Sequence, residues 1–331
     1  MARQVPTYGD VVLARQRIGA LACRTPLIEH PALNGATGAR VLLKAENLQR
    51  VGAFKFRGAY NKIVQLDKAA FPGGVVACSS GNHAQGVAAA ATLRGLKSTI
   101  VMPSDAPRLK IERTRAFGAE VVPYDRAKED RDAIAREICA RRTAAYVHPF
   151  DDPDVIAGQG TVGLEMMEQA QALGLAPDIV LVGVSGGGLI GGVSLAVKET
   201  SPGAEIWSVE PAGFDDLARS LVRGEREKNE RLSGSICDAL MAATPGELTF
   251  EMAKRSLAGG LAVTDEEAKA AVRFAFRELK LVLEPGGAVS LAAILAKKMD
   301  FQGKTVMAVL SGGNIDPSLF AEIILEQRHA A

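Results

Sequence analysis

The stretch GGVVACSSGNHAQGVAAAATLRG at residues 73–95 decides the fold class of this chain. It begins with a short apolar run, GGVVAC, whose valines are typical of a buried strand. A polar turn follows, and then a longer alanine-rich segment with helical period. A strand followed by a helix is the repeating unit of α/β proteins with parallel strands.

The same order recurs along the chain. In residues 98–142, STIVMP precedes RLKIERTRAFG, and AEVVPY precedes AKEDRDAIAREICARR. In residues 177–210, PDIVLVGV precedes GLIGGVSLAVKET, and AEIWSVE comes next. KTVMAVL at residues 304–310 comes before a closing helix. The chain is therefore predicted to be an α/β protein whose parallel sheets are flanked by helices.

The segment HPFDDPDVIAGQG at residues 148–160 interrupts this alternation with two prolines and three aspartates. We therefore predict a small domain at residues 73–150 and a large domain made of residues 1–72 and 151–331. Ligands of open α/β sheets bind at the carboxyl ends of the strands. The loops after VVAC, VLVGV and VMAVL are accordingly where we expect the chemistry.

The composition excludes several classes of partner. The 39 lysines and arginines nearly balance the 38 acidic residues, so no field of one sign attracts nucleic acid or an anionic membrane. The chain shows neither a membrane-spanning apolar run nor a secretory signal in MARQVPTYGDVV. The four cysteines, Cys23, Cys78, Cys139 and Cys237, are widely spaced, which favours reduced thiols. We expect a cytoplasmic protein with a small neutral or zwitterionic ligand.

A glycine-rich loop, VSGGGLIGG at residues 184–192, follows a predicted strand and opens a helix. Its backbone N–H groups at the positive end of the helix are suited to bind a phosphate. The glycines at 186, 188 and 191 also match the dinucleotide fingerprint, with Glu210 placed where a ribose-binding acid would stand. A nicotinamide-dependent oxidoreductase is therefore an alternative, and a helix entry that needs glycine only for packing is another.

Three further features carry possible chemistry. Lys55 lies between Phe54 and Phe56, and an apolar setting lowers the pKa of an amine and favours the neutral form that attacks an aldehyde. The serine-rich turn at 79–82 offers hydroxyls and N–H groups for a carboxylate, or simply caps a helix. Ser311 places a hydroxyl at the end of a strand. An imine-forming lysine, a phosphate loop and a hydroxyl for a ring nitrogen are together the requirements of pyridoxal phosphate.

Six motifs, in order, cover nearly the whole chain: GAFKFRGA, CSSGNHAQGVA, HPF with VIAGQGT, VSGGGL, EPAGFDDL and LSGGNID. In these motifs the sequence resembles the serine/threonine dehydratase and serine racemase family, within the tryptophan-synthase-β-like, fold-type II enzymes that use pyridoxal phosphate. The resemblance implies a two-domain fold with open twisted sheets. It also implies a homodimer.

The resemblance assigns a cofactor role to several residues. Lys55 would be the Schiff-base lysine, Phe54 would pack near the ring, and Asn82 would bond the ring O3′. Ser311 would face the pyridine nitrogen, and Glu284 would lie close to the cofactor. The phosphate would be held by Ser185, Gly186, Gly187, Gly188 and Leu189. Ala239 stands where near relatives usually carry glycine against the ring, so ring packing or substrate preference is expected to differ.

The resemblance also places the substrate. Its carboxylate would be held by Ser79, Ser80, Asn82 and His83, with His83 contributing a backbone contact and Arg131 standing beside the pocket or only on a solvated helix face. Ser80 is the serine that racemases of this family carry as acid/base opposite the lysine, which predicts serine racemase activity as a side reaction.

EPAGFDDL resembles the divalent-cation site of the family, with the carboxylates of Glu210 and Asp216 and the main-chain carbonyl of Phe214 as ligands. Hard oxygen ligands suit Mg²⁺ or Ca²⁺, with Mn²⁺ possible. The alternative is that the two acids only cap a helix.

The implied activity is that of a lyase that converts L-threonine or L-serine to 2-oxobutanoate or pyruvate and ammonia. Within the family, a dehydratase of 3-hydroxyaspartate or of a hydroxyectoine-derived acid, or a serine racemase, remains open. A non-catalytic protein that binds pyridoxal phosphate is a further alternative.

Overall fold

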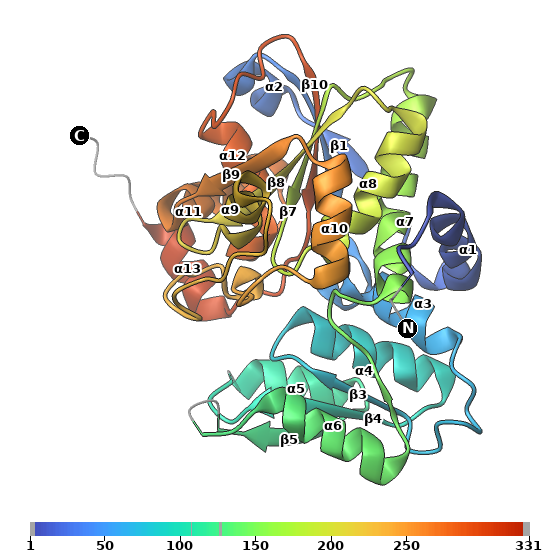
Figure 1. The fold of residues 1–331 in the computed structure, drawn as a ribbon. Coiled ribbons are helices and arrows are strands. Elements are labelled where there is room, and N and C mark those ends of the chain that lie inside the picture. The colour runs from blue at the N-terminus through green and yellow to red at the C-terminus, as the bar shows by residue number, and fades with distance from the viewer. Residues whose placement is uncertain (1–3, 107, 126–127, 327–331) are drawn as a thin grey trace.

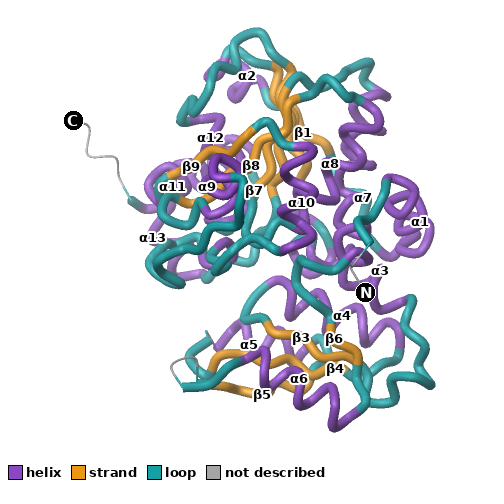
Figure 2. The backbone as a smooth tube through the Cα atoms, viewed as in Figure 1, coloured by secondary structure: helices purple, strands orange, loops and turns teal. Residues whose placement is uncertain are grey.

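The computed structural model describes residues 4–106, 108–125 and 128–326. They form two open sheets, one of six strands and one of four, each covered by helices (Figures 1 and 2). Mixed α/β architecture with parallel sheets is what the alternating sequence pattern predicts, and the fold class is confirmed.

The larger sheet has the strand order β1-β2-β10-β7-β8-β9. Only β1 is antiparallel to its neighbour, and the other described pairs are parallel. Strands β7 and β10 are almost entirely buried, as expected for parallel strands with helices on both faces. The strands are β1 (Leu27–Glu29), β2 (Arg40–Ala45), β7 (Ile179–Gly183), β8 (Glu205–Pro211), β9 (Gly259–Val263) and β10 (Thr305–Leu310).

The smaller sheet is parallel throughout and has the strand order β5-β4-β3-β6. Its strands are β3 (Val75–Cys78), β4 (Ser98–Pro103), β5 (Glu120–Tyr124) and β6 (Ala145–Tyr146). All four come from within residues 75–146. The division into domains at residues 72/73 and 150/151 remains a proposal.

The sequence pattern located β3, β4, β5, β7, β8 and β10 but not β1, β2, β6 and β9.

Helices cover both sheets, and Figure 1 shows α4, α5 and α6 around the smaller one. These three are α4 (Asn82–Arg94), α5 (Arg108–Ala116) and α6 (Arg131–Arg142). The others are α1 (Tyr8–Ile18), α2 (Pro31–Thr37), α3 (Lys55–Val64), α7 (Pro153–Ala172), α8 (Gly188–Thr200), α9 (Asp216–Arg223), α10 (Glu247–Ser256), α11 (Asp265–Phe274), α12 (Pro285–Leu295) and α13 (Pro317–Leu325). The irregular helical turns are η1 (Gly19–Leu21), η2 (Glu46–Leu48), η3 (Arg50–Gly52), η4 (Asp238–Leu240) and the π-type η5 (Ala275–Leu279).

Helix α3 lies close to both α4 and α7 because glycines stand at the contacts. A Cβ on Gly158 of α7 would lie 2.6 Å from the Cα of Gly58 on α3. A Cβ on Gly86 of α4 would lie 3.1 Å from the carbonyl carbon of Lys55. The backbone that carries Lys55 is thereby packed against a helix of each sheet.

Within the described residues, no helix is both long enough and apolar enough to cross a bilayer.

Candidate active site

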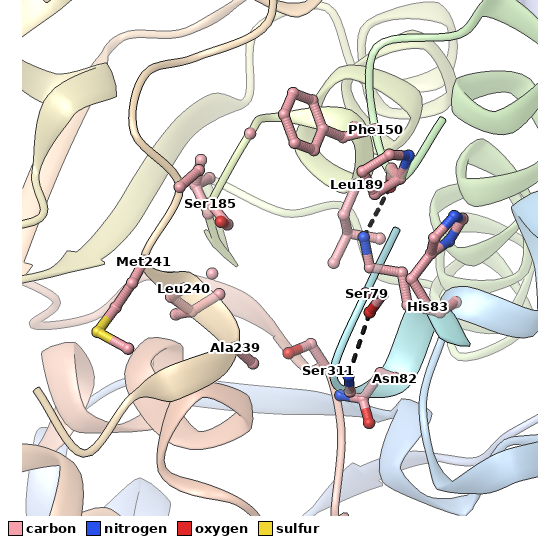
Figure 3. A pocket seen from close by; sticks show the side chains of 18 of the residues that line it. Ser79, Asn82, His83, Phe150, Ser185, Leu189, Ala239, Leu240, Met241 and Ser311 are labelled. Carbon is pink, nitrogen blue, oxygen red and sulfur yellow. Dashed lines mark hydrogen bonds between the residues drawn. The ribbon is translucent and has the colours of Figure 1, made fainter. Parts of the chain in front are cut away.

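A cavity lies where the carboxyl ends of three strands meet. Ser79 follows β3, Ser185 follows the end of β7, and Ser311 follows β10, and all three line it. In Figure 3, Ala239 and Met241 lie on one side of the cavity, and Ser79 and His83 lie on the other. The cavity therefore takes its walls from the segments of both sheets. The lining includes every cofactor and substrate residue expected from the sequence, namely Phe54, Lys55, Ser79, Ser80, Asn82, His83, Arg131, Ser185, Gly186, Gly187, Gly188, Leu189, Glu284 and Ser311.

Lys55 is the first residue of α3, and it lines this cavity. The Nζ atom donates a hydrogen bond of 2.7 Å to the carbonyl oxygen of Pro149 and lies 5.2 Å from the ring centroid of Phe54. Burial without a paired carboxylate lowers the pKa of Lys55 from 10.5 to about 8. The amine is thus neutral in part near physiological pH, as nucleophilic attack on an aldehyde requires.

A buried ionic cluster holds the first turn of α3 in place. Arg57 is fully buried and donates to both carboxylate oxygens of Glu46, at 2.7 and 2.8 Å, and to Glu165 at 2.9 Å. Lys44 completes the cluster with a bond of 2.9 Å to Glu165. Two cations and two anions balance, which is the condition for keeping charges in an apolar interior. The cluster fixes the backbone two residues from Lys55.

The glycine loop between β7 and α8 has a shape that side chains would block. Gly187 has φ +93°, a conformation that strongly favours glycine. A Cβ on Gly186 would lie 2.3 Å from the ring of Phe150, and Thr249 Oγ1 donates to the Gly186 carbonyl at 2.6 Å. The first N–H groups of α8 have no partner within the helix and lie at its positive end. The loop therefore fits a phosphate group.

Asn82 is held from two sides by residues of the larger sheet. Its Nδ2 donates to Oε1 of Glu284 at 2.5 Å, and its Oδ1 accepts from Nδ2 of Asn314 at 2.8 Å. Burial raises the pKa of the Glu284 carboxyl from 4.5 to about 7. The amide of Asn82 is thus fixed in orientation at the start of α4. Asn314 was not anticipated as a site residue, although it belongs to the LSGGNID motif.

The ring of His83 does not offer a hydrogen-bond donor to the substrate. Its Nε2 lies 3.0 Å from the carbonyl oxygen of Val147, a geometry in which Nε2 carries the hydrogen. Its buried Nδ1 has no partner among the described residues. Burial, with the nearby Lys55 charge as a second cause, lowers the pKa of His83 to about 3, so the ring is neutral. Only the backbone N–H of His83, in the first turn of α4, is suited to hold a carboxylate.

The cavity also contains charged residues that sequence reasoning missed. Lys110 on α5 forms an ion pair with Asp238 on η4, and both line the cavity. Arg131, which the sequence did suggest, also lines the cavity; its guanidinium lies 3.9 Å from Asp132 and is about half exposed. No local pattern marks Lys110 and Asp238, because they are 128 residues apart and meet only when the two sheets pack together.

Comparisons with known proteins place this architecture in a family. The family model described as pyridoxal-phosphate dependent enzyme matches residues 20–312. The chain belongs to this family. An L-threo-3-hydroxyaspartate ammonia-lyase of a Pseudomonas species is 40% identical over 97% of this chain and 99% of the relative. An L-threonine ammonia-lyase of Thermotoga maritima is 42% identical over 96% of this chain and 78% of the relative. The structure of maize serine racemase matches with a TM-score of 0.90 and 34% identity, covering 97% of this chain and 98% of that one.

Membership in the pyridoxal-phosphate family explains the glycine loop as a phosphate site, so the oxidoreductase alternative with its dinucleotide is not needed. Glu210, the acid that the oxidoreductase alternative needs for a ribose, is completely buried and does not line the cavity. Its two carboxylate oxygens accept hydrogen bonds from the backbone N–H groups of Leu217 and Ala218, at 3.0 and 2.8 Å. Glu210 is therefore directed at the start of α9 and not at a nucleotide.

Glu210 and Asp216 lie close enough together for the Asp216 charge to affect the titration of Glu210. Burial raises the pKa of Glu210 well above its ordinary value, with the Asp216 charge as the second cause. Burial raises the pKa of Asp216 to about 6. Asn229 donates to Asp216 Oδ1 at 2.6 Å, while the buried Oδ2 has no partner among the described residues. Within the same residues, no group of three or more His, Cys, Asp or Glu side chains could hold a metal, so a site here needs oxygen donors other than side chains of these types.

Proposed function

We propose that this protein is a pyridoxal-phosphate-dependent ammonia-lyase that converts L-threonine or L-serine to 2-oxobutanoate or pyruvate and ammonia. The observation that carries the proposal is that one cavity joins a half-buried lysine whose amine has a lowered pKa, a glycine loop that fits a phosphate and a serine-rich helix start. Relatives named as ammonia-lyases over nearly the full chain support it.

Different residues of the cavity would hold the phosphate, the aldehyde carbon and the ring of the cofactor. Residues 185–189 would hold the phosphate at the start of α8, and Lys55 would bind the aldehyde carbon. Asn82 would bond O3′, and Ser311 would face the ring nitrogen. When bound, pyridoxal phosphate withdraws electrons from the bond between Cα and hydrogen of the amino acid.

The chain itself would position the substrate and move its proton. The N–H groups at the start of α4 and the hydroxyl of Ser79 would bind the α-carboxylate. The Lys55 amine would take the Cα proton, for which a pKa near 8 is suitable. The β-hydroxyl leaves as water, and a later water molecule releases ammonia, so that threonine yields 2-oxobutanoate and ammonia with no net change in water.

A panel of β-hydroxy amino acids tests the proposal. Purified holoenzyme is expected to release ammonia and the matching 2-oxo acid from L-serine or L-threonine. Lys55→Ala should lower the rate at least 1000-fold and abolish visible absorbance, because covalent catalysis depends on this amine. Lys62→Ala is the matched control, since Lys62 is on the same helix but pairs with Asp152 and Asp154. A protein that binds the cofactor but releases no ammonia from any member of the panel would instead be a non-catalytic binder.

Serine racemase activity is a second candidate, and Ser80 favours it. Ser80 lines the same cavity as Lys55 and is half-buried. A second proton carrier at this position would return a proton to Cα from the other face. L-serine should yield measurable D-serine, and Ser80→Ala should reduce D-serine more than pyruvate. No D-serine in an assay that produces ample pyruvate would contradict this candidate.

A divalent cation, Mg²⁺, Mn²⁺ or Ca²⁺, would be held by Glu210, Asp216 and the carbonyl of Phe214. Asp216 Oδ2 has no partner in the described part of the chain, and it lies beside a second buried acid; both facts support this site, because a cation would neutralise charges that burial penalises. The hard oxygen donors suit these three ions.

We also propose a cytoplasmic homodimer. Leu48 and Val282 are partly exposed apolar residues on neighbouring segments, since Asn47 Nδ2 donates to the Val282 carbonyl at 3.2 Å. All four cysteines are free, which suits a reducing compartment. Sedimentation should give twice the monomer mass, and Leu48→Lys should shift the mass towards the monomer.

A further inference from the structure

The ion pair between Lys110 and Asp238 joins two sides of the cavity wall. Lys110 is in α5, which covers the smaller sheet, and Asp238 begins η4 on the side of the larger sheet. Both side chains line the cavity. The pair therefore lies beside the space that the substrate would occupy.

Lys110 and Arg131 are cations that a simple amino acid does not require. The phosphate of the cofactor is matched by the start of α8, and the α-carboxylate is matched by the start of α4. Lys110 and Arg131 lie outside both helix starts, on α5 and at the first residue of α6, yet both line the cavity. Two cations beyond the groups needed for one carboxylate indicate a place for a second one.

Asp238 occupies this place with a carboxylate of the protein. Its side chain is about half exposed, whereas that of Lys110 is 17% exposed, so the pair is partly solvated. Ion pairs of this kind are weak, and exchanging one carboxylate for another changes little in the interaction of the ammonium. A carboxylate on the substrate could thus replace Asp238 at Lys110.

A substrate with an uncharged β-substituent gains no binding energy from the cations at Lys110 and Arg131. A methyl group beside Lys110 and Arg131 would remove water from charged groups without replacing its hydrogen bonds, which is unfavourable. Apolar side chains line other parts of the wall, among them Leu240 and Met241 at and after η4 and Leu189 in α8 (Figure 3). The charged and apolar parts of the wall would thus distinguish substrates by their β-substituent.

We propose that Lys110, assisted by Arg131, selects β-hydroxy amino acids that carry a second carboxylate, and that Asp238 holds Lys110 in place until that carboxylate displaces it. The inference rests on the proposed function, because it names the substrate class of the same site. The simplest such substrate is L-threo-3-hydroxyaspartate, which would give oxaloacetate and ammonia in a balanced reaction.

The test compares two substrates that differ only in the β-carboxylate, L-threo-3-hydroxyaspartate and L-serine. The ratio of their kcat/KM values should fall at least tenfold in Lys110→Gln. It should rise at least threefold in Asp238→Asn, because the internal competitor is neutral. Arg136→Gln is the control, since Arg136 is on the exposed part of α6 and does not line the cavity. A ratio that stays within twofold in both variants would overturn the inference.

Binding of succinate gives a readout that does not depend on turnover. Succinate has two carboxylates at the spacing found in 3-hydroxyaspartate, and butyrate has one. By calorimetry on holoenzyme, the Kd of succinate should rise at least tenfold in Lys110→Gln and fall in Asp238→Asn, with smaller changes for butyrate. Equal changes for both acids would overturn the inference. If wild-type enzyme releases ammonia from neither amino acid, the proposed function fails and this inference fails with it; ammonia with unchanged ratios defeats the inference alone.

Discussion

Asn314 donates its Nδ2 hydrogen to Oδ1 of Asn82 across 2.8 Å, and this bond joins the loop after β10 to the start of α4. Asn314 also donates to the carbonyl oxygen of Val51 at 2.7 Å. The amide of Asn82 accepts from one side and donates to Glu284 on the other, so it cannot rotate without losing a bond. Asn314 is thus a positioning residue that does not line the cavity.

Asn314→Ala should lower kcat by roughly 10- to 100-fold, because small displacements of a positioned group have effects of this size. KM should change less, and the visible absorbance of the bound cofactor should shift because Asn82 is freed. Asn34→Ala is a control of the same chemistry, since Asn34 bonds Glu29 and Val41 far from the cavity. A variant of Asn314 with wild-type kcat and spectrum would show that Asn82 needs no support.

Gly187→Ala should weaken cofactor binding. Its φ of +93° costs an alanine roughly 1–2 kcal/mol, and the new Cβ would lie 2.8 Å from Thr249. Gly174→Ala is a matched control, because it has φ +69° but no atom within 4 Å of the added Cβ. Both variants should lose stability, but only Gly187→Ala should raise the Kd of pyridoxal phosphate, measured by fluorescence titration. Equal Kd values in the two variants would argue against a phosphate role for the loop.

Arg57→Met should destabilise the protein by about 3–5 kcal/mol, because Glu46 and Glu165 would keep buried charges without their main partner. Arg40→Met removes an exposed ion pair with Glu29 and should cost less than about 1 kcal/mol. Urea unfolding of the two variants measures the difference. A loss for Arg57→Met no larger than that for Arg40→Met would contradict the assigned role of the cluster.

The stability of cofactor-free protein should depend on pH through Glu284. Its pKa is raised from 4.5 to about 7 by burial, so the folded state holds a proton that the unfolded state releases. This contribution is complete below pH 4.5 and is lost as the pH rises through 7. Relative to wild type, Glu284→Gln should therefore gain stability between pH 5 and 8, by at most about 3 kcal/mol.

Urea titrations at several pH values measure this difference, with the exposed Glu278→Gln as control. A difference between Glu284→Gln and wild type that is constant with pH would show that the Glu284 carboxyl titrates normally.

Removal of divalent cations should lower the thermal midpoint by several degrees, as expected for a ligand that binds only the folded state. Adding Mg²⁺ to chelator-treated protein should restore it in wild type but not in Asp216→Asn. Asp178→Asn should respond like wild type, since Asp178 caps the start of β10 by accepting from Thr305. Identical thermal midpoints with and without the cation would exclude the proposed site.

Most strands and helices, and the apolar setting of Lys55, could be predicted from the sequence because they depend on residues that are near one another in the chain. Alternating periodicity defines strands and helices locally, and parallel strands bring Ser79, Ser185 and Ser311 to one edge region through chain topology. The glycine loop likewise predicts its own conformation, since a positive φ at Gly187 is a local property.

Only the packed tertiary structure decided which distant side chains meet. Asn82 reaches Glu284 across 202 residues, Lys110 reaches Asp238 across 128, and Arg57 reaches Glu165 across 108. The first two pairs join segments of the two sheets, and the third joins α3 to α7. Each pair therefore depends on how elements pack in space, which a local sequence pattern does not encode. The neutral ring of His83 has the same origin, because its lowered pKa comes from burial by segments that fold over it.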